Sequence, residues 1–383
     1  MHRATPRADL FENGSRSSSL SSKRLQHSTP STPSPDTPLK HKRLRSDLPI
    51  LPNVYAHTPY PLLLDRSFFL APPPPPPDYF ASSYSNYFSD TFTPMDLIGQ
   101  GESALVYRVR SRLDGFVYAV KMSRQPFSGI KDRSIKLHEV QVLWDLAHVP
   151  NCINLISAWE QNGILYLQMH FCEGGSLASY LQSHASIDIS ILVELFSQVS
   201  NGLADMHALN IIHLDLKPAN ILINRKHTFQ IADFGLASYL PVPRGMEPEG
   251  DRAYIAPEIL LGVYGKPADI FSFGLVMLES LLGVEIPENG PAWRELRREN
   301  GGAGSSVSLD SFLASAESGM RSGCISPPEP QGTRDAMRAD EADARNTMLH
   351  LVTRRMLEPD PVKRITAREL VAESHRLRMA FSS

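Results

Sequence analysis

The 383-residue sequence predicts an α+β protein in which a small β-rich lobe precedes a larger, mostly helical lobe. Strand-like stretches at 117–122 and 164–169 flank one amphipathic helical run at 135–143. After about residue 174 the pattern turns helical, and apolar residues recur at helical spacing through 189–207. The expected boundaries are 92–172 for the first lobe and 173–380 for the second, with a hinge near 170–173.

Within the first lobe, the segment 98–106 reads as strand, glycine turn, strand, with the pattern Gly-x-Gly-x-x-Ala. Gly99 and Gly101 let the backbone approach phosphate oxygens, because no Cβ stands in the way. A glycine turn alone is weak evidence, since most are plain hairpins. Here an apolar strand follows and ends in Lys121, at the spacing of a lysine that contacts nucleotide phosphates and pairs with a helix glutamate, which we assign as Glu139.

A second group of motifs opens the larger lobe, where 213–220 reads His-Leu-Asp-Leu-Lys-Pro-Ala-Asn. Asp215 can orient a hydroxyl nucleophile, and Lys217 can reach a transferring phosphate. Asn220 and Asp233, the latter in an Asp-Phe-Gly motif, offer the oxygen ligands that Mg²⁺ prefers. Together with Ala-Pro-Glu at 256–258, these motifs resemble those of protein kinases in kind and order. The resemblance implies the bilobal protein-kinase fold, with ATP and Mg²⁺ as cofactors.

The same resemblance assigns the residues around the nucleotide. Met169 is expected to guard the adenine pocket, and backbone groups near Cys172 to hydrogen-bond the base, although core packing would explain both residues equally well. The expected nucleotide-binding residues are Ile98, Gly99, Gly101, Val106, Ala119, Lys121, Met169, Cys172 and Leu222. The expected catalytic residues are Asp215, Lys217, Lys121 and Glu139, and the expected metal ligands are Asn220 and Asp233.

Two more residues receive structural roles from the resemblance. Asp269, at the head of the apolar helix 270–283, is expected to hold the catalytic loop by its backbone amides. Arg364 is expected to form a buried ion pair with Glu258 of the Ala-Pro-Glu motif.

Three departures from the common kinase pattern are informative. Ala104 stands in place of the third glycine, which makes the phosphate-covering loop stiffer but removes no catalytic group. Leu214 stands where most kinases have an arginine that reads a phosphate on the activation segment, so control by such phosphorylation is not expected. Asp251 occupies the usual place of a threonine, where a carboxylate could pair with Lys217 directly.

These departures resemble the Wee family of mitosis-inhibitor kinases. The similarity rests on 213–220, on 249–258, on 163–168 and on 268–275, while 126–133 is similar to the membrane-associated branch. It implies phosphorylation of a tyrosine in the glycine-rich loop of a mitotic cyclin-dependent kinase in complex with cyclin, which blocks entry into mitosis. Lys217 taken alone favours a Ser/Thr kinase of another pathway, and a pseudokinase that binds its partner without chemistry is a third reading.

Residues 1–89, rich in Ser, Thr and Pro, are expected to form a disordered tail, and 298–345 a flexible insert. The tail holds Ser/Thr-Pro pairs that proline-directed kinases could phosphorylate, and a basic run at 40–45 that could direct nuclear import. A solvating tail would produce such matches by chance equally often.

The bulk composition excludes several function classes. A net charge of −3 does not favour binding to nucleic acid. The three cysteines show neither metal-ligand spacing nor a disulfide framework. The most apolar helix candidate, 270–283, contains Glu279 and is too short to span a bilayer. We expect a soluble, monomeric protein of the nucleus, present also in the cytoplasm.

Overall fold

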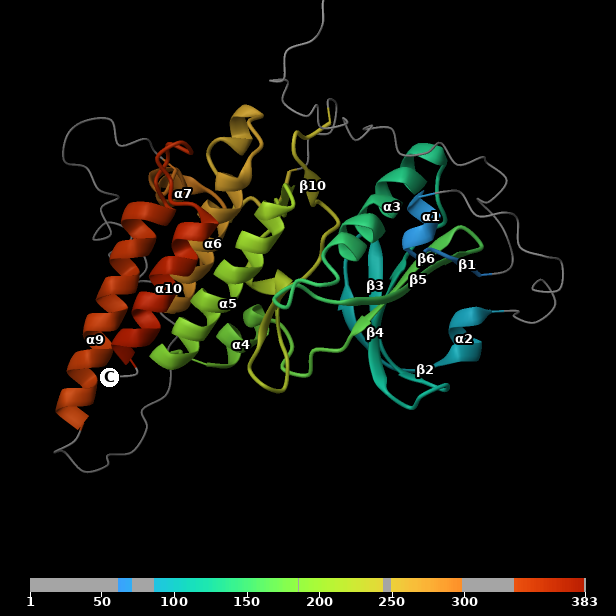
Figure 1. Ribbon diagram of the computed structural model, residues 1–383, viewed down its shortest axis with the longest axis horizontal. Helices are drawn as coiled ribbons and strands as arrows, with labels where there is room; N and C mark the ends of the chain where they lie inside the picture. The colour runs from blue at the N-terminus through green and yellow to red at the C-terminus, as the bar shows by residue number, and fades with distance from the viewer. Residues whose placement is uncertain (1–60, 71–85, 185, 244–248, 298–333, 382–383) are drawn as a thin grey trace, which may run out of the picture. The chain divides into compact units, whose positions relative to one another are not determined.

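The computed structural model describes residues 61–70, 86–184, 186–243, 249–297 and 334–381. An antiparallel sheet of six strands, in the order β1-β5-β6-β4-β3-β2, forms the first lobe (Figure 1). Its strands are β1 (Leu62–Leu63), β2 (Phe92–Gln100), β3 (Ala104–Ser111), β4 (Val117–Ser123), β5 (Leu155–Gln161) and β6 (Ile164–His170). Three helices accompany the sheet, namely α1 (Arg66–Leu70), α2 (Tyr87–Thr91) and α3 (Ile130–Asp145).

The sheet has apolar residues on both faces. One face joins the main core, together with α3 residues such as Leu137 and Val140. The other carries an aromatic stack, in which Trp159 lies 4.9 Å from the ring of Tyr166 and 6.0 Å from that of Phe92. Because both faces are covered, the lobe is a packed scaffold that can hold charged side chains at fixed positions.

The second lobe is mainly helical. Its α-helices are α4 (Leu177–Ser183), α5 (Ile189–Ala208), α6 (Lys266–Leu282), α7 (Gly290–Glu295), α9 (Arg334–Leu351) and α10 (Ala367–Phe381). Two short 3₁₀ helices, η3 (Pro218–Asn220) and η4 (Ile259–Leu261), and a π-helical turn, η6 (Val352–Met356), accompany them. Two small sheets pair β7 (Ile211–Ile212) with β10 (Ser238–Tyr239) and β8 (Ile221–Ile223) with β9 (Phe229–Ile231). The predicted α+β, two-lobe fold is thus confirmed, and among the described helices none has the length and apolarity to cross a membrane.

Two boundary predictions are wrong in part. The expected disorder up to residue 89 does not hold at 61–70, where β1 and α1 form, or at 86–89, which belong to the start of α2. The expected insert of 298–345 is helical from 334, because Ala, Arg, Glu and Met favour helix and because Ala344 and Met348, one turn apart, are buried against the core. The Ser/Thr-Pro pairs, the basic run and the rest of the insert lie outside the described residues.

Candidate active site

Three charged side chains from three separate elements meet at the centre of the site. Lys121 of β4 donates from Nζ to Oε1 of Glu139 in α3 at 2.6 Å, and to Oδ1 of Asp233 at 2.8 Å. Burial alone would lower the pKa of Lys121, but the two carboxylates outweigh it and raise that pKa above its ordinary value. Lys121 in turn lowers the pKa of Asp233. The predicted pair of Lys121 and Glu139 is therefore present.

The sheet register sets the surroundings of Lys121. Val106 of β3 lies directly opposite Lys121, and Met169 of β6 lies opposite Ala119. Residues paired across antiparallel strands share a face, as do residues two apart on one strand. These four side chains therefore point to the same side of the sheet, as the nucleotide-binding assignment requires.

The glycine turn between β2 and β3 ends this row. Gly101 N–H donates to the carbonyl of Ala104 at 3.0 Å, which closes the turn. A Cβ on Gly99 would lie 3.2 Å from Cβ of Val106, so a larger residue there requires the side chain of Val106 to shift. Ile98 sits in a register shift of β2 and is 46% exposed.

The hinge lies against β8. Gly174 N–H donates to the carbonyl of Ile223 at 2.8 Å, and Ser176 forms a bridge with Leu222. Cys172 is buried, and its thiol donates to Oε1 of Gln230 at 3.5 Å. Leu222 therefore neighbours the hinge, while contacts of these residues with a nucleotide remain a prediction.

Three donors fix the carboxylate of Asp215. Its Oδ1 accepts from the backbone N–H of Asp251 at 2.8 Å, and its Oδ2 accepts from Nδ2 of Asn220 at 3.0 Å. Nζ of Lys217 lies 3.1 Å from the same Oδ2 and 3.2 Å from Oδ2 of Asp251. Burial would lower the pKa of Lys217, but Asp215 and Asp251 together raise it. The pairing of Lys217 with Asp251 that the sequence indicated is present.

Asp269 of α6 holds the backbone of the catalytic loop. Its fully buried carboxylate accepts the backbone N–H groups of His213 and Leu214 at 2.9 Å, and Nε2 of His207 also lies 2.9 Å away. Burial alone would raise the pKa of Asp269, but the hydrogen bond and charge of His207 dominate and lower it. The predicted holding contact is present, and it fixes the backbone from which Asp215 projects.

The Ala-Pro-Glu motif is held by the predicted buried pair. Both terminal guanidinium nitrogens of Arg364, Nη1 and Nη2, donate to the carboxylate of Glu258, at 2.5 and 2.9 Å. Arg364 also donates to the carbonyls of Pro267, Glu358 and Pro359, so its donors are satisfied by fixed acceptors. This bidentate pair ties the end of the activation segment to the loop before α10.

Sequence reasoning missed Gly250, whose backbone packs directly under the catalytic loop. A Cβ built there would overlap the carbonyl oxygen of Leu214 and lie 3.1 Å from Oδ1 of Asp215. Only glycine allows this approach. Its position immediately before Asp251 was the available signal, but a lone glycine in a segment without a turn pattern did not stand out.

Sequence reasoning also missed Arg297, which fixes the segment 252–255. Arg297 is buried, donates to the carbonyls of Arg252, Ala253 and Ile255, and lies over the ring of Trp293 at 4.3 Å. Trp293 Nε1 donates to the same Arg252 carbonyl at 2.8 Å. Burial lowers the pKa of Arg297 to about 9. These contacts hold the segment that follows Asp251, although Arg297 itself lies 39 residues after Glu258, the last residue of the Ala-Pro-Glu motif.

The donor set fits the predicted metal. Asn220 donates from Nδ2 to the carbonyl and to Oδ2 of Asp215, which leaves its own Oδ1 as an acceptor. Asp233 has one oxygen on Lys121 and a side chain that is 52% exposed. A carboxylate and an amide oxygen are hard ligands of the kind that suits Mg²⁺.

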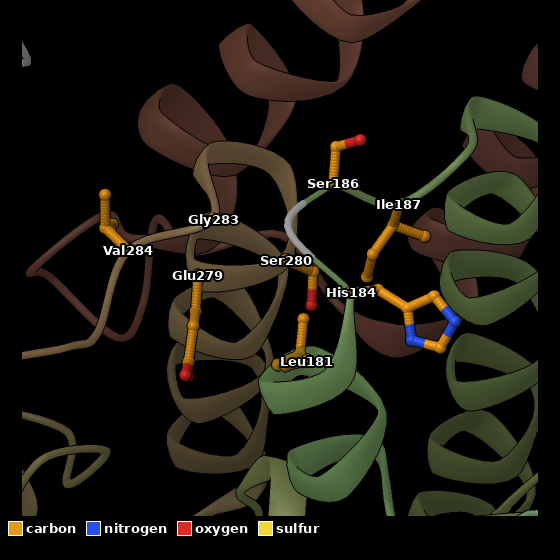
Figure 2. A pocket seen from close by; sticks show the side chains of 8 residues that line it. All are labelled: Leu181, His184, Ser186, Ile187, Glu279, Ser280, Gly283 and Val284. Atoms are coloured by element: carbon orange, nitrogen blue, oxygen red, sulfur yellow. The ribbon is translucent and has the colours of Figure 1, made fainter. Parts of the chain in front are cut away.

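A small pocket lies elsewhere, where the C-terminal ends of α4 and α6 meet (Figure 2). Its lining residues are Leu181, His184, Ser186, Ile187, Glu279, Ser280, Gly283 and Val284. None of these belongs to the expected nucleotide-binding set. Glu279 accepts from the hydroxyl of Tyr254 at 2.5 Å, so the pocket wall is tied to the activation segment.

Comparison with known proteins agrees with this geometry. The model of the protein kinase domain matches residues 92–375, and the chain belongs to the protein kinase family, which uses ATP and typically Mg²⁺. Among curated proteins it is 40% identical over 221 residues to the mitosis inhibitor protein kinase wee1 of Schizosaccharomyces pombe. It is 41% identical over 216 residues to the membrane-associated tyrosine- and threonine-specific cdc2-inhibitory kinase of Drosophila melanogaster.

A third relative is the mitosis inhibitor protein kinase mik1 of Schizosaccharomyces pombe, at 37% identity over 212 residues. The three matched regions cover 54–56% of this chain but only 25–40% of the relatives. The resemblance to the Wee family is thereby confirmed, over less than half the length of those relatives.

Proposed function

We propose that this protein transfers the γ-phosphate of ATP to a tyrosine in the glycine-rich loop of a mitotic cyclin-dependent kinase, and so inhibits entry into mitosis. The proposal rests on one observation: two clusters of catalytic side chains are both present and both held in fixed geometry. Lys121 is paired with Glu139, and Asp215 is held by Asn220 and Lys217. An enzyme of this family needs all of these side chains in place.

The residues divide the chemistry between them. Asn220 and Asp233 would hold Mg²⁺, which would neutralise charge on the phosphates of bound ATP, the donor of the phosphoryl group. Asp215 accepts the hydrogen bond of the substrate hydroxyl and orients its oxygen. Lys217, already next to that carboxylate, stabilises negative charge on the phosphoryl oxygens. Alignment and charge stabilisation account for the rate in such a transfer.

The choice of target rests on the relatives. The Drosophila relative is named for tyrosine- and threonine-specific inhibition of cdc2, and both yeast relatives are named mitosis inhibitors. Asp251 in place of the common threonine, with its carboxylate 3.2 Å from Lys217, sets this catalytic loop apart from that of ordinary Ser/Thr kinases. We infer that the acceptor is tyrosine and that the substrate is the complex of kinase and cyclin.

A Ser/Thr kinase of another pathway is the second candidate, because Lys217 is common in that class. A pseudokinase is the third, although Lys121, Glu139, Asp215, Asn220 and Asp233 are all present. We propose action in the nucleus, on account of the basic run at 40–45, by a monomer that binds no nucleic acid.

One experiment separates these candidates. The purified full chain is incubated with Mg·ATP and a catalytically dead cyclin-dependent kinase–cyclin complex, and the phosphorylated residue is mapped. Phosphotyrosine in the glycine-rich loop of the target supports the proposal, and Ser/Thr elsewhere supports the second candidate. Phosphate incorporation no greater than that of an Asp215→Asn control identifies a pseudokinase.

A further inference from the structure

Arg252 is an exposed cation next to the catalytic loop. It follows Asp251, whose backbone N–H donates to Oδ1 of Asp215 at 2.8 Å. Among the described residues no carboxylate forms an ion pair with Arg252, and that of Asp251 is already paired with Lys217 at 3.2 Å. Most exposed arginines are simply solvated. Two features of its surroundings distinguish Arg252 from that case.

The first feature is an indole that orients the guanidinium. The guanidinium of Arg252 lies over the ring of Trp293, 5.0 Å from the ring centroid. Trp293 of α7 is itself held in place, because its Nε1 donates to the backbone carbonyl of Arg252 at 2.8 Å. An arginine that stacks on an aromatic ring keeps its N–H groups directed outward in its own plane, where they can reach an acceptor. Arg252 therefore presents oriented donors to the solvent.

The second feature is a concentration of positive charge around the same indole. Arg297 also lies over Trp293, 4.3 Å from the ring centroid, and is 7% exposed. Burial, and then the charge of Arg252, lower the pKa of Arg297 to about 9. Two like charges that share one ring repel each other, so the arrangement is electrostatically unfavourable without an anion. A bound anion would offset that repulsion.

The two arginines have different tasks at this site. The donors of Arg297 already bind the backbone carbonyls of Arg252, Ala253, Ile255 and Trp293. The buried guanidinium therefore fixes the backbone and contributes positive potential, but it has no donor to offer a ligand. The exposed guanidinium of Arg252 is the group that can contact an anion.

The location of Arg252 indicates which molecule supplies this anion. The nucleotide phosphates have partners of their own, in Lys121 and in the metal ligands Asn220 and Asp233. Arg252 lies instead between Asp251 and the Ala-Pro-Glu motif, and its side chain extends toward α7. An acceptor protein must bring its hydroxyl to Asp215, and an extended chain advances about 3.4 Å per residue. A side chain a few residues from the phosphorylated one can therefore reach Arg252.

We propose that Arg252, stacked on Trp293, is a specificity-determining residue that binds an anionic side chain of the acceptor protein, a few residues from the phosphorylated one. The proposal rests on the kinase activity proposed above and adds the class of substrate, an acidic acceptor segment. The carboxylate of Asp or Glu matches the paired donors of a guanidinium, and a phosphorylated side chain offers the same chemistry. A basic side chain at that place is disfavoured by repulsion.

A peptide library measures the charge preference directly. Peptides with a central tyrosine carry Glu, Gln, phosphoserine or Lys at one flanking position at a time, and kcat/KM is determined with the purified full chain. At one or two positions, kcat/KM for Glu is expected to exceed that for Gln about three- to tenfold, as for an oriented ion pair at a surface. The value for Lys is expected to fall below that for Gln. Added salt should reduce both differences, because it screens such a pair.

Variants of Arg252 assign the preference to this side chain. Arg252→Ala and Arg252→Gln are each expected to bring the ratio of kcat/KM for Glu and Gln peptides close to one, and Arg252→Glu to invert the preference in favour of Lys. Arg225→Ala is the matched control and is expected to keep the ratio, because it removes an exposed arginine of the same lobe that is paired with Glu173. A purely structural role would lower kcat/KM for all peptides and leave their ratio unchanged.

The wild-type library alone can overturn the proposal. Equal values for Glu and Gln at every position contradict it, and so does a preference that survives Arg252→Ala. A preference for phosphoserine over Glu that Arg252→Ala abolishes supports the site and identifies its ligand as a phosphorylated acceptor.

A second library with a central serine or threonine separates this proposal from the proposed function. Activity confined to that library overturns the assignment of tyrosine as acceptor, while the charge preference is still measured within the active library. A wild-type chain that phosphorylates neither library overturns both proposals.

Discussion

Replacement of Gly250 by alanine tests how closely the activation segment must approach the catalytic loop. The new Cβ would overlap the carbonyl oxygen of Leu214 and lie 3.2 Å from Cα of Asp215, so the segment must move outward. That movement carries the backbone N–H of Asp251 away from Oδ1 of Asp215, which it now approaches at 2.8 Å. The substitution therefore releases one of the three donors that orient the carboxylate.

The size of the effect follows from that hydrogen bond. A hydrogen bond to a charged group contributes about 1.5–3 kcal/mol. Its loss from the oriented state lowers kcat roughly ten- to hundredfold. Binding of Mg·ATP should change little, because the segment around Lys121 is untouched. The expected signature is a low kcat with near-normal nucleotide affinity.

The assay measures kcat with a protein acceptor and nucleotide affinity by titration with Mg·ATP. Gly265→Ala is the matched control, since a Cβ there meets only Cδ of Pro267 at 3.4 Å. A Gly250→Ala enzyme with the kcat of wild type would show that the close approach to Leu214 is not needed. The reasoning on the orientation of Asp215 would then be wrong.

Four further substitutions test other parts of the site. Lys121→Met should lower kcat at least about a hundredfold with an unchanged circular dichroism spectrum, since it removes a positioning charge and no core contact. Arg364→Leu should lower the free energy of unfolding in urea by about 3–5 kcal/mol, because Glu258 is left buried and unpaired. A loss below about 1 kcal/mol, as expected of an exposed pair, would contradict this. Arg297→Met should raise KM for the protein acceptor several-fold while leaving ATP hydrolysis without acceptor unchanged, because only the segment 252–255 loses its support. Asp269 has a lowered pKa in the folded protein, so its stabilising effect is full above its unfolded pKa of about 4 and is lost as the pH falls through the folded pKa. The difference in unfolding free energy between wild type and Asp269→Asn should therefore be constant from about pH 5 to 7 and shrink below about pH 4, and a difference that grows on acidification would refute the assignment.

The parts of the site that could be predicted from sequence are those written in local motifs. Asp215, Asn220 and Lys217 share one loop of eight residues, so their spacing alone indicates that they converge. The partner of Lys121 was harder to predict, because a helical glutamate reaches the lysine only if it lies on the correct face of its helix. The order of the motifs nevertheless indicated Glu139. Arg364 could be paired with Glu258 only through the resemblance to kinases.

The contacts that escaped prediction join distant segments that carry no motif. Leu64 and Trp144 are 80 residues apart, and nothing in either neighbourhood indicates the other. Leu62, Leu64 and Phe68 lie in a tail that is rich in proline and serine, and the composition of the whole tail predicted disorder. Burial of leucine and phenylalanine nevertheless stabilises this short segment. Gly250 packs through its own backbone, and the guanidinium of Arg297 donates to backbone carbonyls, so neither contact has a partner side chain that a sequence pattern could indicate.

The three tryptophans of the chain lie in three different parts of the fold, so their intrinsic fluorescence can report on each part. Trp144 sits at the end of α3, Trp159 in the aromatic stack of the sheet, and Trp293 beneath Arg252 and Arg297. Variants that retain a single indole would emit from α3, from the sheet of the first lobe or from α7 alone. Fluorescence of each could then time the movement of that element separately during a catalytic cycle.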